Sequence, residues 1–167
     1  PEQEKEIHTL ISKTAGVLNF TNCASHTEIK INAEGIFVIE TSPRLGGDFI
    51  TSHLVPLSTC VNIEDQLINI AMGEKVDYKL ESKVSLISYF NFPVGKKIIN
   101  AISIDEIRER FSNVVEYRLD LKTNQETNII TNSLNRYGYF ILAGTEKKTL
   151  LEQRDKINVF LGNQLNL

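Results

Sequence analysis

Two glutamates flank a predicted turn in the first third of the chain. Glu28 lies in residues 26–31 and Glu40 in residues 36–41, and the first stretch alternates polar and apolar side chains as a half-buried strand does. A hairpin with a three-residue loop that includes Gly35 would set the two glutamates directly opposite each other. Facing carboxylates repel by about 0.2–1 kcal/mol at an exposed site. A divalent cation reverses that sign, so the pair is a candidate magnesium site.

This interpretation depends on the register of the hairpin. The three-residue loop pairs Asn32 with Ile36 and gives the hairpin one apolar face, made of Ile29, Ile31, Phe37 and Ile39. Two alternatives stay open. The carboxylates could form a solvated pair, with Lys30 reducing the repulsion. A two-residue loop at residues 33–34 would instead shift the register by one position and separate the carboxylates.

The segment after Glu40 carries groups that suit phosphate oxygens. Arg44 presents a bidentate guanidinium that fits a phosphate or an acyl-phosphate oxyanion. Gly46 and Gly47 have no side chains, so their backbone N–H groups can approach a ligand as oxyanion donors. A carboxylate pair, an arginine and exposed amides together are what phosphoryl transfer requires. A surface ion pair at Arg44 and an ordinary turn at the glycines are the structural alternatives.

Two further polar residues lie next to this segment. His26 shares the polar face of Glu28, where it could approach a substrate or make a structural contact. Asp48 could contact an incoming amine or cap a short helix, and we favour the cap. His53 is interpreted as a plain loop residue.

The elements that position these residues form an α+β order. An amphipathic helix that ends at Gly16 precedes the hairpin. An irregular stretch, residues 42–60, follows it, and a helix capped by Asn62 then runs to Gly73. A polar linker, residues 74–82, leads to a small α+β unit. In this unit we predict strands at 83–91, 96–102, 112–121 and 136–143, helices at 103–110 and 146–161, and a loop at 122–135. The predicted domains are residues 1–75 and 76–167.

Composition limits the function classes. The chain has 167 residues, 41% of them hydrophobic and 23% charged, with a formal net charge of −3. No basic cluster points to nucleic acid, and no apolar run reaches the roughly 20 residues of a membrane helix. The two cysteines are too few for a disulfide framework, and we interpret them as small core residues. The chain opens without Met, inside a helix, so we expect a piece of a longer cytoplasmic protein.

The pattern of residues 26–48 resembles the ATP-grasp signature. In that signature a first Glu, a short hairpin and a second Glu are followed by an Arg and often by Gly-Gly, as in Glu28, Glu40 and P-R-L-G-G at 43–47. The ending R-L-G-G-D and the segment after it are most similar to the L-amino-acid-ligase group of carboxylate–amine ligases. Residues 132–139, NSLNRYGY, also resemble the small C-terminal domain of that group. The resemblance implies the C-terminal half of an ATP-grasp fold followed by a small α+β domain.

The resemblance also implies roles for the candidate residues. Glu28 and Glu40 would bind Mg²⁺ (or Mn²⁺) that bridges the ATP phosphates, and Arg44 with the Gly46 and Gly47 backbone would face the transferred phosphate. Ser42 stands where the family usually has Asn, which puts a second metal ion in question. The family's N-terminal half, with its lysines for the nucleotide phosphates and its adenine-binding hinge, is absent from this sequence.

We therefore predict a fragment of an ATP-dependent ligase that joins a small carboxylate to an amine through an acyl phosphate. The partners would be ATP, the two substrates, the missing N-terminal half and, in addition, a second copy in a homodimer. The alternatives are a purine-biosynthetic or carbamoyl-phosphate-type ATP-grasp enzyme, or a non-catalytic interaction module that retains an acidic hairpin.

Overall fold

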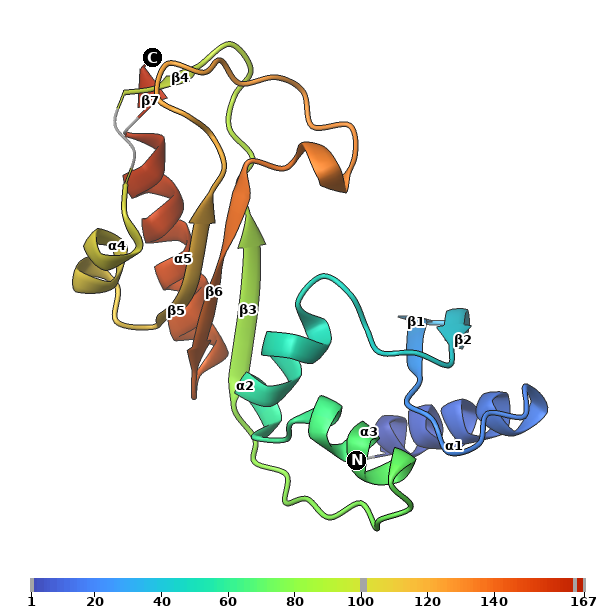
Figure 1. Ribbon diagram of the computed structural model, residues 1–167. Coiled ribbons are helices and arrows are strands. Elements are labelled where there is room, and N and C mark those ends of the chain that lie inside the picture. Colours follow the sequence, from blue (N-terminus) through green and yellow to red (C-terminus); the bar gives the residue numbers. More distant parts are fainter. Residues whose placement is uncertain (1, 100–101, 164, 167) are drawn as a thin grey trace. The chain divides into compact units, whose positions relative to one another are not determined.

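The computed structural model describes residues 2–99, 102–163 and 165–166 (Figure 1). Its contacts divide the chain into two compact units. The first unit runs to Pro56 and includes Val61–Lys79, and the second contains Leu57–Cys60 and the chain from Leu80 onward. Helices and antiparallel strands occur in both, which confirms the α+β fold class. The domain boundary predicted between residues 75 and 76 stays a prediction.

The first unit places a two-stranded hairpin among helices. Its elements are α1 (Glu2–Val17), β1 (His26–Asn32), β2 (Gly35–Ser42), the π-helix η1 (Ile50–Leu54), α2 (Val55–Thr59) and α3 (Ile63–Ala71). Of these, α2 continues into the second unit. The predicted apolar positions of α1, Ile7, Leu10, Ile11 and Ala15, are half-buried, although the helix continues through Gly16 to Val17. Asn62 caps α3 as predicted, because its side-chain oxygen accepts hydrogen bonds from the backbone N–H groups of Glu64 and Asp65.

The stretch predicted to be irregular, residues 42–60, is helical over its second half. A π-helix and then α2 occupy residues 50–59. Two consecutive residues before them, Asp48 and Phe49, have left-handed backbones with φ of 47° and 65°. Aspartate adopts this conformation more readily than most residues, but phenylalanine rarely does, so the sequence gives little local indication of this turn.

The second unit is a three-stranded antiparallel sheet with helices packed against it. Its sheet order is β3-β6-β5, formed by β3 (Val84–Tyr89), β5 (Val114–Leu119) and β6 (Gly138–Gly144). The remaining elements are β4 (Lys97–Ile98), α4 (Ile104–Arg110), the 3-10 helix η2 (Ser133–Asn135), α5 (Lys147–Gly162) and β7 (Leu165–Asn166). Figure 1 shows α5 lying along this sheet. The predicted elements are present, but the strand expected at 96–102 is only Lys97–Ile98, and part of its range lies outside the described residues.

An apolar core holds the second unit together. Phe90, directly after β3, and Phe140 and Leu142 of β6 are at most 1% exposed. They pack against buried residues of the helices, namely Ile107, Leu150, Ile157 and Leu161. Close approach of β5 to β6 requires a glycine at one point. Gly138 has a φ of +122°, and a Cβ there would lie 2.0 Å from the carbonyl oxygen of Arg118.

The cysteines differ from the core positions that we predicted. Cys60 is exposed and Cys23 half-buried, and both are free thiols. Cys60 donates to Glu81 Oε2 at 3.3 Å and accepts from Lys83 Nζ at 3.2 Å, and this contact with two charged side chains keeps it at the surface. Within the described residues, no helix combines the length and the apolar character that a membrane span requires.

Candidate functional site

Glu28 and Glu40 lie directly opposite each other in the hairpin, as predicted. The loop length that produces this pairing differs from the predicted one. The turn has two residues, so Asn32 pairs with Gly35 and not with Ile36. This turn alone would have separated the carboxylates. A β-bulge between the Ile29–Val38 pair and the Glu28–Glu40 pair then adds Ile39 to β2 and restores the opposition.

The two-residue turn changes which side chains share the apolar face. Ile29 pairs with Val38 and Ile31 with Ile36, so these four residues lie on one face. The predicted face was wrong for Phe37, which pairs with Lys30 on the opposite face, and for Ile39, which lies in the bulge. Phe37 and Ile39 are 44% and 62% exposed.

The carboxylate pair belongs to a cluster of polar side chains, which we call the acidic cluster. His26 Nε2 lies 3.6 Å from Glu28 Oε1, and Arg44 Nη2 lies 3.8 Å from Glu40 Oε1. Ser42 pairs with His26 across the strands, and its hydroxyl donates to Glu40 Oε1 at 3.5 Å. The structure thus brings five predicted or considered residues together. Lys30, in contrast, forms no ion pair with either carboxylate in the described part of the chain.

The backbone at Gly46 packs against His26. A Cβ at Gly46 would lie 2.9 Å from His26 Nδ1, closer than real Cβ atoms come to other atoms, and 3.1 Å from Ile50 Cγ2, which is a tight contact. Gly46 is therefore required for this packing, whatever its chemical role. Around Gly47 a Cβ would meet nothing within 4 Å. Its carbonyl accepts from the N–H of Ile50 at 2.9 Å and so starts the turn into η1.

Asp48 and His53, the two other residues considered near the site, lie at or within the π-helix η1. Asp48 is not the N-cap residue of η1, contrary to our prediction, because that position is Phe49, whose side chain makes no capping hydrogen bond. His53 lies within η1 and not in a loop, with its ring edge-on to Phe49 at 5.5 Å between centroids and Nδ1 2.8 Å from Ser52 Oγ.

A pocket of about 300 Å³ adjoins the cluster at His26 and Gly46. Its wall is mainly aliphatic and comes from α1, β1, the loop after β2, η1, α2 and α3; the lining residues include Ile11, Leu45, Ile50, Thr51, Val55 and Ile63. Sequence reasoning missed this pocket. Its residues are spread over several elements, so no spacing in the sequence indicates it.

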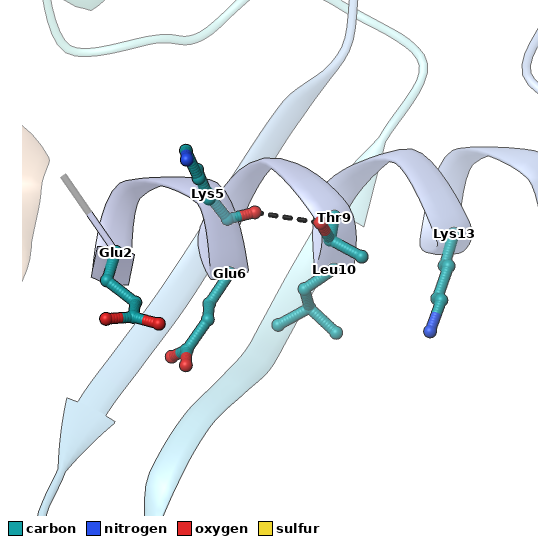
Figure 2. Close-up of a pocket in the computed structure, with 6 residues that line it drawn as sticks. All are labelled: Glu2, Lys5, Glu6, Thr9, Leu10 and Lys13. Atoms are coloured by element: carbon teal, nitrogen blue, oxygen red, sulfur yellow. Dashed lines mark hydrogen bonds between the residues drawn. The ribbon is translucent and has the colours of Figure 1, made fainter.

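A second hollow, of about 380 Å³, lies along the exposed side of α1 (Figure 2). The side chains that line it all belong to this one helix, and the hydrogen bond drawn there joins Thr9 Oγ1 to the Lys5 carbonyl at 2.8 Å. No second element closes it and it contains no residue of the acidic cluster. We therefore assign it no ligand.

Comparison with known proteins was made by sequence and by structure. No family model and no curated protein matches the sequence. Solved structures do match. The L-amino acid ligase from Bacillus licheniformis has a TM-score of 0.74 at 15% identity, over 98% of this chain and 42% of that one. Phosphoribosylglycinamide synthetase from Anaerococcus prevotii has 0.66 at 19% identity, over 95% and 40%. N5-carboxyaminoimidazole ribonucleotide synthetase from Thermotoga maritima has 0.63 at 14% identity, over 99% and 42%.

The chain has the fold of the C-terminal part of an ATP-grasp enzyme. It spans about 40% of the length of the solved structures that it matches. The agreement covers nearly all of this chain, so it includes both the hairpin unit and the small α+β unit. This result confirms the family resemblance inferred from residues 26–48 at the level of the fold.

Proposed function

We propose that this chain is part of an ATP-dependent carboxylate–amine ligase and supplies the metal and phosphate contacts of its active site. The observation that supports this most strongly is the Glu28–Glu40 pair with Arg44 beside it, on an ATP-grasp fold. An interaction module has no need for two facing carboxylates and an arginine on one face of a hairpin. Their mutual repulsion instead favours a cationic ligand.

The donor set fits magnesium. Glu28 and Glu40 are 58% and 56% exposed at their side chains, so their oxygens are open to a ligand. Among the described residues, no group of three or more His, Cys, Asp and Glu side chains could hold a metal ion, so the metal site that we propose depends on two carboxylates. Magnesium is typically bound through one or two carboxylates together with substrate phosphates and water. When bound, it would neutralise the negative charge of the ATP phosphates.

The reaction proposed has two steps. An oxygen of the substrate carboxylate attacks the γ-phosphorus of ATP, the bond to the β-phosphate oxygen breaks, and ADP leaves. The amine nitrogen then attacks the acyl carbon, the phosphate leaves with the bonding electrons, and the nitrogen gives up a proton to form the amide. Both steps build negative charge on oxygen.

The residues of this chain have distinct parts in these steps. Arg44 would hold the oxygens of the phosphoryl group through its guanidinium. The Gly46 and Gly47 backbone would donate to the developing oxyanion. Ser42 has a short, uncharged side chain whose hydroxyl donates a hydrogen bond to Glu40, and it would orient that carboxylate. These roles also require residues that bind the nucleotide base, which we expect in the N-terminal half of a longer protein. The cytoplasmic location of that protein stays a prediction.

A purine-biosynthetic ligase is the second candidate. Two of the solved structures compared above are a phosphoribosylglycinamide synthetase and an N5-carboxyaminoimidazole ribonucleotide synthetase. The higher TM-score of the L-amino acid ligase favours the first candidate. A panel of amino acids, glycine with phosphoribosylamine, and bicarbonate with aminoimidazole ribonucleotide would separate the two.

Glutamine substitutions in the full-length protein test the proposal. ADP release that depends on both a carboxylate and an amine should fall by at least about 10²-fold in Glu28→Gln and Glu40→Gln. Glu34→Gln changes an exposed carboxylate in the turn of the same hairpin and should keep wild-type activity. Equal activity in all four proteins would exclude this hairpin as the metal site.

A further inference from the structure

The pocket beside Gly46 has features of a binding site for a neutral side chain. Its volume of about 300 Å³ is at the lower end of the roughly 300–1,000 Å³ typical of small-molecule sites. Of its lining residues, His26 alone is titratable. The pocket therefore has no permanently charged side chain, and an ionised group that entered it would lose its hydration without forming an ion pair in return.

Thr51 supplies a polar group inside the pocket. The residue is only 7% exposed and lines the pocket. Its hydroxyl is uncharged, so it does not alter the preference of the pocket for a neutral ligand.

The pocket shares two residues with the acidic cluster. His26 contacts Glu28 through Nε2, while its Nδ1 lies against Gly46. Because both residues also line the pocket, a group held there lies next to the backbone proposed to face the reacting carboxylate.

We infer that this pocket holds the uncharged aliphatic side chain of the carboxylate substrate, which makes the substrate a small carboxylate with a branched or linear apolar substituent. The inference rests on the proposed function for the identity of the ligand, but binding to the pocket is measurable without turnover. Apolar walls provide affinity through burial, and each buried methylene contributes roughly 0.8 kcal/mol.

Binding is tested on the 167-residue chain by ¹H–¹⁵N NMR with 3-methylbutanoate as the probe. Amide shifts should appear at Ile50, Thr51 and Ile63. They should be lost in Ile63→Phe, which fills the pocket, and kept in Ile68→Phe, which adds the same ring on the exposed side of the same helix. Glutarate, with a second charge, should cause no shifts. Ala24→Leu fills the pocket from a loop and replaces Ile63→Phe if that variant does not fold.

Turnover is tested separately in the full-length protein, with hydroxylamine as the amine and ADP release as the readout. In Ile63→Phe, kcat/KM for 3-methylbutanoate should fall about 10–200-fold while that for acetate is unchanged. No ADP release from any carboxylate, with the NMR shifts present, would refute the proposed ligase function and leave the pocket standing. Absent shifts, or an unchanged preference in Ile63→Phe, would refute the pocket assignment and leave the ligase function standing.

Discussion

Glu40 is the residue on which the contacts of the cluster converge. The Ser42 hydroxyl and the Arg44 guanidinium both approach its Oε1, at 3.5 Å and 3.8 Å. Arg44 is 58% exposed, and its second nitrogen, Nη1, donates to the Leu45 carbonyl at 3.0 Å. Exposed ion pairs of this kind contribute only about 0–1 kcal/mol to stability. The arrangement therefore adds little to the stability of the fold.

The first prediction concerns Arg44 in the full-length protein. Arg44→Ala should lower kcat by about 10²–10³-fold, because the guanidinium meets charge that is greatest in the transition state. Arg44→Lys keeps the charge but loses the bidentate fork, so it should not restore activity. The measurements are kcat and the melting temperature of all three proteins. Full activity in Arg44→Ala would remove the arginine from the site, and a large fall in melting temperature would make its role structural.

The two adjacent glycines form a matched pair. Gly46→Ala should displace His26 or Ile50, because its new Cβ would lie 2.9 Å and 3.1 Å from them, whereas Gly47→Ala meets open space. We expect a cost of roughly 1–3 kcal/mol for Gly46→Ala and almost none for Gly47→Ala. Chemical denaturation of the 167-residue chain measures both. Equal stability of the two variants would show that His26 does not hold the Gly46 backbone in solution.

At the scale of elements, the hairpin and the sheet are positioned in different ways. The hairpin brings its carboxylates together only because a two-residue turn and a bulge compensate each other. The sheet of the second unit is instead continuous with a buried core, in which β6 is buried on both faces. Tyr117 on β5 packs its ring edge-on against Phe90, at 5.8 Å between centroids. Its buried hydroxyl has no hydrogen-bond partner within the described residues.

The raised pKa of Tyr117 predicts how the stability of the second unit changes at high pH. Burial, and then the Glu106 carboxylate, raises the pKa of Tyr117 to about 12 from the ordinary value of 10.0. The folded state holds the proton more tightly, so this contribution is fully present below pH 10 and is lost as the pH rises to 12. The loss is at most about 2–3 kcal/mol, because solvent around the partly exposed side chain screens the charge.

Urea unfolding between pH 8 and pH 12 measures this effect. Tyr117→Phe should reduce the fall in stability with pH and should leave stability at pH 8 equal or slightly higher, since the hydroxyl that it removes is unpaired. Tyr139, whose pKa burial and Glu116 also raise to about 12, should leave part of the slope in place. An unchanged pH profile in Tyr117→Phe would contradict the assignment.

At the scale of the whole molecule, the chain corresponds to only part of the length of its structural neighbours. It covers 40–42% of the length of the three solved structures compared above. The carboxylates of its hairpin are more than half exposed, and the apolar Phe37 and Ile39 on the same hairpin are exposed as well. A two-stranded hairpin is only marginally stable in water without further packing. These features agree with our proposal that other parts of a longer protein complete the site.

The isolated chain should therefore show no amide synthesis and only weak magnesium binding. Most phosphate contacts are expected outside it, and magnesium loses its water reluctantly without substrate phosphates. Titration calorimetry with MgCl₂ and an ADP-release assay on the 167-residue chain measure both. Amide formation by this chain alone would overturn the interpretation as a fragment.

The sequence by itself determined the types of residues and the local elements. The polar and apolar alternation around residues 26–41 indicates two strands, and Asn62 before an apolar helical repeat indicates a cap. The order of Glu28, Glu40 and Arg44 resembles the ATP-grasp signature. These features depend on residues close in sequence, where the periodicity of side chains is fixed by the backbone.

The tertiary structure alone decided the register and the surroundings of the site. Pairing of Glu28 with Glu40 results from a turn and a bulge whose relative stability depends on both strands and on what packs against them. The packing of His26 on Gly46 and the pocket around Thr51 join residues from different elements. Such contacts have no repeating pattern along the chain, because packing depends on shape and volume in three dimensions.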